Sequence, residues 1–132
     1  MEDSVATARS LAEDDPYCET LGIELTDIGE GTATTELTVT EDLLNFHGTP
    51  HGGAVYSLAD AAFAAASNSH GDTAVALETN ISYLDAVDVG DVLTATAEET
   101  HVAGRTAEYE VVVTDQDDER ISTFRGRVYI LG

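Results

Sequence analysis

One carboxylate in this chain stands where a charge is costly. Asp60 follows Leu58-Ala59 and precedes Ala61-Ala62, inside a run of small and apolar residues. A carboxylate in such surroundings loses hydration unless a partner compensates for it. It is either a catalytic base or nucleophile, or a structural group paired with a buried donor, and its neighbours alone favour the structural role.

A glycine pair lies shortly before this carboxylate. Pro50 and His51 lead into Gly52-Gly53, which suits a tight bend that opens a helix, because glycine adopts dihedrals that other residues avoid. A plain turn is the alternative for a glycine pair. We predict that a long helix begins at Gly52 or Gly53 and is apolar nearly all round, as a buried helix is. Its apolar positions at helical spacing are Val55, Leu58, Ala59, Ala62, Phe63 and Ala66.

The chain before this helix is predicted to contain a helical segment and a hairpin. A short helix from Ser4 to Ala12 is expected within residues 1–16, and Asp14-Asp15-Pro16 ends it. Two runs that alternate apolar and polar residues, Leu21 to Leu25 and Ala33 to Val39, flank a turn that contains two glycines. Alternation with a period of two predicts an antiparallel hairpin.

Four runs rich in strand-forming residues follow the long helix, separated by polar and glycine-containing turns. They are Thr73 to Leu84, Val92 to Val102, Arg105 to Thr114 and Arg120 to Leu131. We predict that these four strands form a meander. The whole chain, residues 1–132, is then a single α+β domain in which an antiparallel sheet wraps around one long central helix, the hotdog fold.

The charge of the chain is strongly acidic. It has 26 acidic residues against 5 basic ones, all of them Arg, for a formal net charge of -21. At molar salt the Debye length falls to about 3 Å and the resulting repulsion is screened. This composition predicts a protein from a halophilic organism. Nucleic acid is not an expected partner, because the chain has no basic patch.

Other partners and compartments are constrained by what the sequence contains. Cys18 is the only cysteine, so neither an internal disulfide nor a cysteine-based metal site is expected. His47 and His51 have the spacing of helical metal ligands, but Gly48 and Pro50 oppose a regular helix there, so we predict no metal. Without an apolar run of membrane-spanning length or a cationic leader, the protein is expected to be cytoplasmic, with no membrane contact.

Several motifs together resemble the PaaI-type hotdog thioesterases, which hydrolyse acyl-CoA. The resemblance extends from about Leu21 to the C-terminus, and its specific part is HGG with an Asp eight positions after the first glycine and an Asn six before the His. The matching residues are Leu44-Asn45, His51 to Ala64, Asn68-Ser69, Gly71, Ile81, Tyr83-Leu84, Gly90-Asp91, Leu93 to Ala97 and Phe124-Arg125-Gly126. The resemblance implies a cofactor-free enzyme that hydrolyses a phenylacetyl-like, other aryl or medium-chain acyl-CoA.

The resemblance also implies roles for single residues. Asp60 matches the catalytic carboxylate, acting as general base on water or as nucleophile, which reverses the preference for a structural role. The N–H groups of Gly52-Gly53, at the positive end of the helix dipole, resemble the oxyanion donor. Asn45 matches an amide that holds substrate or water, and His51 matches a histidine that shapes the same turn. Some relatives carry Ser or Thr where this chain has Ala76, and Thr79, which is close in sequence, is the candidate hydroxyl here.

Further substrate contacts are predicted more loosely. Asn68 is a candidate, although an Asn at this position more often ends a helix. Arg suits the phosphates of CoA because its planar fork binds oxygens bidentately. The candidates are Arg105 after a turn and Arg125 with Arg127 on one face of the last strand. Pairing with surface carboxylates is the alternative for each of them.

The spacing between Gly53 and Asp60 predicts an oligomer. Seven residues separate the two, or about 10 Å of helix, so one thioester carbonyl can hardly touch both. If two such helices pack antiparallel across a two-fold axis, Asp60 of one subunit comes near the Gly53 turn of the other. We therefore expect a homodimer, or a tetramer of paired dimers. A hotdog dimer that binds acyl thioesters without hydrolysing them is the alternative function, and a hydratase of the same fold is a third.

Overall fold

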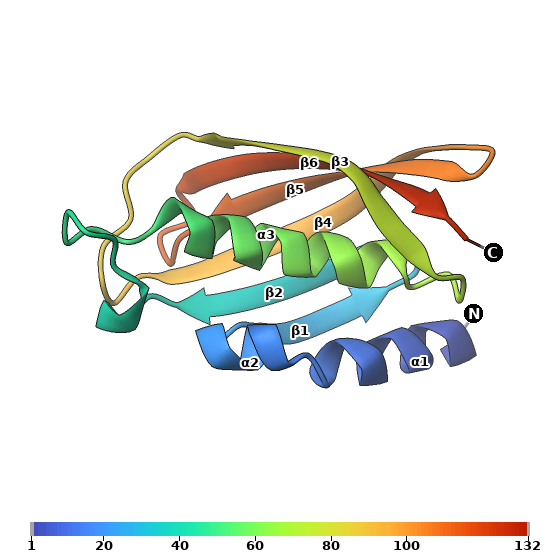
Figure 1. Cartoon of the computed structure of the whole chain (residues 1–132), viewed down its shortest axis with the longest axis horizontal. Helices are drawn as coiled ribbons and strands as arrows, with labels where there is room; N and C mark the ends of the chain where they lie inside the picture. The colour runs from blue at the N-terminus through green and yellow to red at the C-terminus, as the bar shows by residue number, and fades with distance from the viewer. Residues whose placement is uncertain (1, 132) are drawn as a thin grey trace.

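One long helix lies across one face of a six-stranded antiparallel sheet in the computed structural model, which describes residues 2–131 (Figure 1). The strands are β1 (Glu24–Gly29), β2 (Thr32–Thr38), β3 (Ala74–Tyr83), β4 (Val92–Ala103), β5 (Thr106–Thr114) and β6 (Arg120–Ile130). The helices are α1 (Glu2–Glu13), α2 (Pro16–Leu21) and α3 (Gly52–Ser67), with a 3-10 turn, η1, at Glu41–Leu43. This arrangement confirms the predicted hotdog fold.

The central helix α3 begins at Gly52, as the glycine pair predicts. Its residues toward the sheet are buried, among them Leu58, Ala62 and Phe63. The side that carries Asp60 and Ala64 stays partly open in the single chain. The prediction of an apolar helix buried nearly all round is therefore wrong for this side, because no element of the chain covers it completely.

Phe63 anchors α3 on the sheet. Its ring is buried, with centroids 5.8 Å from Tyr109 and 5.6 Å from Phe124. Gly126 on β6 lies directly beneath it, and a Cβ atom there would sit 2.5 Å from Cζ of Phe63. The absence of a side chain at this one position of β6 lets the helix approach the sheet.

The strand order corrects the predicted meander. The sheet runs β1-β2-β4-β5-β6-β3, so only β4, β5 and β6 form a meander, and β3 pairs with β6 at the far edge. The segment after β3 crosses to the other side, where the N–H of Gly90 donates to the carbonyl of Val39 and the N–H of Val39 to that of Asp91. These bonds hold the start of β4 beside β2, and the sheet thereby wraps around α3.

The N-terminal segment has one helix more than predicted. α1 matches the expected short helix, but residues 16–21 form α2, so the alternation predicted from Leu21 onward is wrong at its start. β1 begins at Glu24, and its register with β2 shifts between Leu25 and Asp27. Asp15 caps α2 and Pro16 occupies its first turn, a recognised helix start that was interpreted as a helix end.

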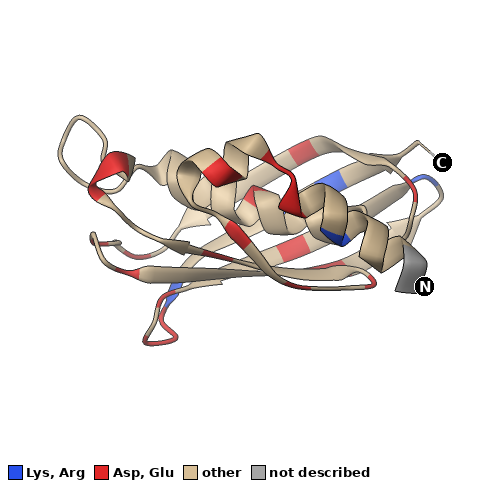
Figure 2. Cartoon of the chain, turned by 90° about the horizontal axis from the view of Figure 1, so that it is seen from below, with Lys and Arg blue, Asp and Glu red and all other residues tan. Residues whose placement is uncertain are grey.

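Acidic residues occur on the helices, strands and loops alike, with few cations between them (Figure 2). One of those cations, Arg127, is paired with Glu108 at 2.6 Å. Most of the acidic charge is therefore not neutralised locally, which is the condition under which screening salt favours the compact state. None of the helices in residues 2–131 is long and apolar enough to cross a membrane.

Gly126→Ala tests the contact between α3 and β6. Alanine normally stabilises a strand by about 0.5–1 kcal/mol relative to glycine. Here we expect a loss of roughly 1–3 kcal/mol in the free energy of unfolding, because the new methyl group collides with Phe63. Chemical denaturation at molar KCl measures it.

Phe63→Leu supplies the matched background for this test. In a double-mutant cycle, Gly126→Ala should cost less when Leu replaces the Phe63 ring. An equal loss in both backgrounds would show that the Phe63 contact does not impose the glycine.

Candidate active site

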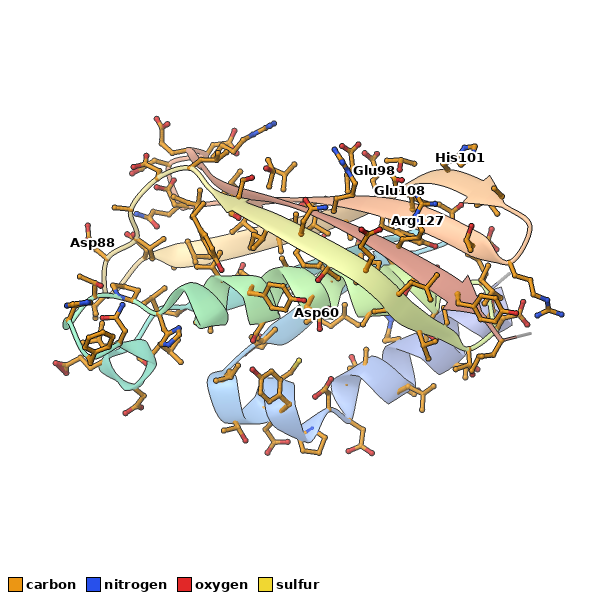
Figure 3. All side chains as sticks on the ribbon, turned by 45° about the horizontal axis from the view of Figure 1, so that its top comes forward. Asp60, Asp88, Glu98, His101, Glu108 and Arg127 are labelled. Atoms are coloured by element: carbon orange, nitrogen blue, oxygen red, sulfur yellow. The ribbon has the colours of Figure 1, made fainter. Side chains whose placement is uncertain are left out.

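Asp60 lies midway along α3, on the side that faces α1 and α2 (Figure 3). Its side chain is half-buried, and no donor in the described part of the chain hydrogen-bonds its carboxylate. Burial, and then the negative charge of Asp15, raise the pKa of Asp60 above its ordinary value. A structural carboxylate would accept a hydrogen bond from the donor that it caps. An unpaired carboxylate with a raised pKa is instead what a general base requires.

The short helix α2 forms the wall opposite Asp60. Oδ1 of Asp15 accepts the N–H of Cys18 at 3.0 Å, and the hydroxyls of Tyr17 and Ser57 join α2 to α3 at 2.8 Å. Burial, then the charge and hydrogen bond of Asp15, raise the pKa of Cys18 to about 11. The thiol is therefore protonated at neutral pH and is no nucleophile. This wall was not predicted, because Asp15 and Pro16, which start α2, also suit the end of a helix.

The glycine turn is held from two sides. His51 caps α3, and its Nδ1 accepts the N–H of Gly53 at 2.9 Å. From β3, the hydroxyl of Tyr83 donates to the carbonyl of Gly52 at 3.0 Å. The histidine that was expected to shape this turn does so. It also occupies the N–H that was predicted to face an oxyanion, so a substrate carbonyl must replace Nδ1 as its acceptor.

Asn45 organises the loop before this turn. Its Oδ1 accepts the N–H of His47 at 2.9 Å, and both the N–H and the hydroxyl of Thr49 at 3.2 Å. These bonds fix the loop that leads into His51. The oxygen of Asn45 is therefore used within the loop, and only its amide N–H groups are available to hold a substrate or water.

Asn68 and Thr79 lie apart from the glycine turn. Asn68 ends α3, since its Nδ2 donates to Ala64 at 2.9 Å and its Oδ1 accepts the N–H of Ala74 at 3.0 Å. The helix-ending alternative is thus observed, although Asn68 also borders the cavity described below. Thr79 on β3 shares a hydrogen bond of 2.6 Å with the hydroxyl of Tyr56. Roles for both in substrate binding stay predictions.

The three candidate arginines do not gather around Asp60. Arg127 lies with Glu108 on the other side of the sheet from Asp60 (Figure 3), and Arg125 approaches the same carboxylate at 3.7 Å. Arg105 donates to the carbonyls of Ile130 and Leu131 at the chain end. Contacts with CoA therefore stay a prediction for Arg105 and Arg125. The alternative of pairing with a carboxylate is observed for Arg125 and Arg127, whereas Arg105 donates to backbone carbonyls.

A cavity of about 250 Å³ adjoins Asp60 along α3. Ala61, Ala64 and Ala65 form its floor, and side chains from α1, α2 and β1 form its walls. A second hollow of about 290 Å³ borders the glycine turn, between Gly53 and Tyr17. Among the side chains that the structure describes, those of residues 4–131, no three from His, Cys, Asp or Glu gather as a metal site would require.

The chain matches a known protein family and known relatives. The model of the thioesterase superfamily matches residues 47–122, from the loop before the glycine turn to β6. The acyl-coenzyme A thioesterase PaaI of Escherichia coli is 39% identical over 125 residues, which is 95% of this chain and 89% of that protein. The chain belongs to the thioesterase superfamily.

Solved structures extend the likeness to three dimensions. The E. coli PaaI protein, from the phenylacetic acid degradation operon, has a TM-score of 0.93 at 37% identity and covers 99% of this chain and 95% of its own. A Streptococcus mutans protein solved bound to acetyl CoA has a TM-score of 0.79 at 26% identity, covering 83% and 89%. The PaaI-type family and fold predicted from HGG and Asp60 are confirmed.

Asp60→Asn tests the cost of keeping this carboxylate on α3. Because the pKa of Asp60 is raised in the folded chain, the fold favours the neutral form, and stability is lost as the pH rises through that pKa. At neutral pH, Asn removes this cost. We expect a higher Tm than wild type at pH 7.5 and a smaller difference at pH 4. A lower Tm at pH 7.5 would indicate that Asp60 is stabilising.

Proposed function

We propose that this protein hydrolyses an acyl-CoA thioester to a free acid and CoA. The observation that carries the proposal is the unpaired, half-buried carboxylate of Asp60 beside an apolar cavity, in a member of the thioesterase superfamily. The name of its relative, acyl-coenzyme A thioesterase PaaI, and the acetyl CoA bound to a second relative support the substrate class.

The proposed chemistry uses one group at the start of α3 and one in its middle. Asp60 either removes a proton from water, whose oxygen attacks the thioester carbon, or attacks that carbon itself and is then released by water. The N–H of Gly53 donates to the carbonyl oxygen as it gains charge. With Asp60 as base, the C–S bond then breaks; with Asp60 as nucleophile, it breaks before water releases Asp60 from the acyl group. In both cases the sulfur of CoA leaves and takes up a proton.

We propose further that two chains complete each site. Asp60 and Gly53 are separated by about 10 Å along one helix, so one carbonyl reaches both only if they come from different subunits. β3 supports such a partner, because it is an edge strand with exposed apolar side chains, Val75, Leu77 and Tyr83, that are 44%, 55% and 53% accessible. Pairing of two β3 edges would cover them.

Asp60→Asn also tests hydrolysis. With phenylacetyl-CoA at molar KCl, we expect kcat to fall by roughly 100-fold or more while CoA still binds. In wild type, kcat/KM should fall as the pH is lowered through the raised pKa of Asp60, since the base must be ionised. The control is Asp88→Asn, which removes an equal charge from a distant exposed loop (Figure 3).

Three outcomes separate the candidate functions. Turnover that depends on Asp60 and not on Asp88 supports the thioesterase. Binding of CoA without turnover in wild type points to the non-catalytic dimer instead. Full turnover by Asp60→Asn would remove Asp60 from the mechanism.

Mixed dimers test the shared site. Gly53→Pro removes the N–H and crowds the His51 ring that accepts it, so this variant should lose activity. Circular dichroism of the purified variant verifies that it folds. Asp60→Asn lacks the base. Refolding the two together gives half mixed dimers, each with one intact site of two, so about a quarter of wild-type activity should return.

The control for this experiment is a mixture of Asp60→Asn with Asp60→Ala, which has no intact site and should stay inactive. Isolation through two different tags verifies that mixed dimers have formed. Inactive mixed dimers of Asp60→Asn and Gly53→Pro would refute a site made from two subunits.

A further inference from the structure

We infer that the acyl group of the substrate enters the partly open cavity bordered by α1, α2, α3 and β1, and that Asp15 restricts this group to uncharged acyl chains or rings. The inference rests on the proposed thioesterase function and specifies the substrate class of the same site. It concerns the part of the thioester on the acyl side of the carbonyl.

Position is the first reason for choosing this cavity. Its floor begins at Ala61, the residue after Asp60, and continues along α3 to Asn68. The seven-residue step from Ala61 to Asn68 spans about 10 Å of helix. It begins beside Asp60, where the thioester carbon must lie. A group attached to that carbon and directed toward the end of α3 lies in the cavity. The second hollow lies instead at the glycine turn, beside His51 and Asp42.

The lining is the second reason. Ala8, Leu11 and Ala12 of α1 face Ile23 and Leu25 across a floor of alanines. A surface of this kind favours an apolar occupant, because burial of apolar area releases water from both partners. A dry cavity of about 150 Å³ holds a benzene molecule, so about 250 Å³ accommodates a ring with a short linker or a medium-length chain.

Charge is the third reason, and it concerns Asp15. This half-buried carboxylate lines the cavity and is held there by capping α2. The cavity continues into a surface hollow that shares Asp15, Cys18 and Leu25 and is bordered by Glu13, Glu19 and Glu24. None of the described residues that line either hollow is Arg or Lys.

An acyl group with a free carboxylate at its far end therefore meets only negative charge in this cavity. Partly buried pairs are screened much less by salt than exposed ones. The preference for uncharged acyl groups should therefore persist at molar salt, which such an acidic chain favours. Repulsion over the open surface is largely removed under those conditions. Asp15 is then a specificity-determining residue, distinct from the base that it faces.

Two acyl-CoAs of equal length test the charge. Hexanoyl-CoA and adipoyl-CoA have the same six-carbon chain and differ in a terminal carboxylate. We expect wild type to prefer hexanoyl-CoA in kcat/KM, and Asp15→Asn to reduce that preference about tenfold. Asn caps a helix as well as Asp does, so α2 should remain folded. Asp88→Asn, the control for net charge, should leave the preference unchanged.

A second variant tests the volume. Ala64→Leu fills the cavity floor with a good helix former. The ratio of kcat/KM for hexanoyl-CoA over acetyl-CoA should fall about tenfold, because only the longer chain needs the space. Ala6→Leu, on the exposed side of α1, adds the same side chain outside the cavity and should leave the ratio unchanged.

Failure of this inference is distinguishable from failure of the proposed function. If wild type hydrolyses hexanoyl-CoA but neither Asp15→Asn nor Ala64→Leu changes its ratio, the acyl group lies elsewhere and the thioesterase stands. An unchanged ratio in Asp15→Asn alone removes Asp15 as the selecting residue. If wild type hydrolyses no acyl-CoA, the proposed function fails and this inference fails with it.

Discussion

The two sides of the central helix α3 lie in opposite environments, one apolar and one that holds a charge. One side of α3 is packed into the sheet, where Phe63 fills the space left by Gly126, and the other side carries the half-buried carboxylate of Asp60. The first contact fixes where the helix lies, and therefore where the carboxylate stands. Keeping the Asp60 carboxylate half-buried costs stability, since burial disfavours its ionised form. Giving up stability for a reactive group is common at functional sites.

Separate elements hold the two ends of the site. The glycine turn is fixed by His51 and by Tyr83 from β3, whereas α2 and Asp15 face Asp60. Because these supports come from different parts of the chain, a change of one need not move the other. The same division separates the cavity beside Asp60 from the hollow at the turn, so the two halves of a thioester would contact different elements.

Local patterns made much of this predictable. The start of α3 follows from glycine conformation, the strands follow from alternation, and Asp60 is conspicuous because charge is rare among alanines. The family followed from the spacing of HGG and Asp60, which is also local. α2 was predictable in principle from Asp15-Pro16 and was missed because the same residues also suit a helix end.

By itself, the sequence determined where α3 begins, where most of the strands lie and which carboxylate is unusual, because each depends on neighbours within a few positions. Only the tertiary structure decided that β3 joins β6 instead of β4, since pairing at an edge depends on which strands the other loops leave open. It also decided that Arg125 and Arg127 meet Glu108 on the other side of the sheet from Asp60, and that Asp15 faces Asp60. These groups are distant in sequence and are placed by packing, and their distances to one another set the electrostatics of the site.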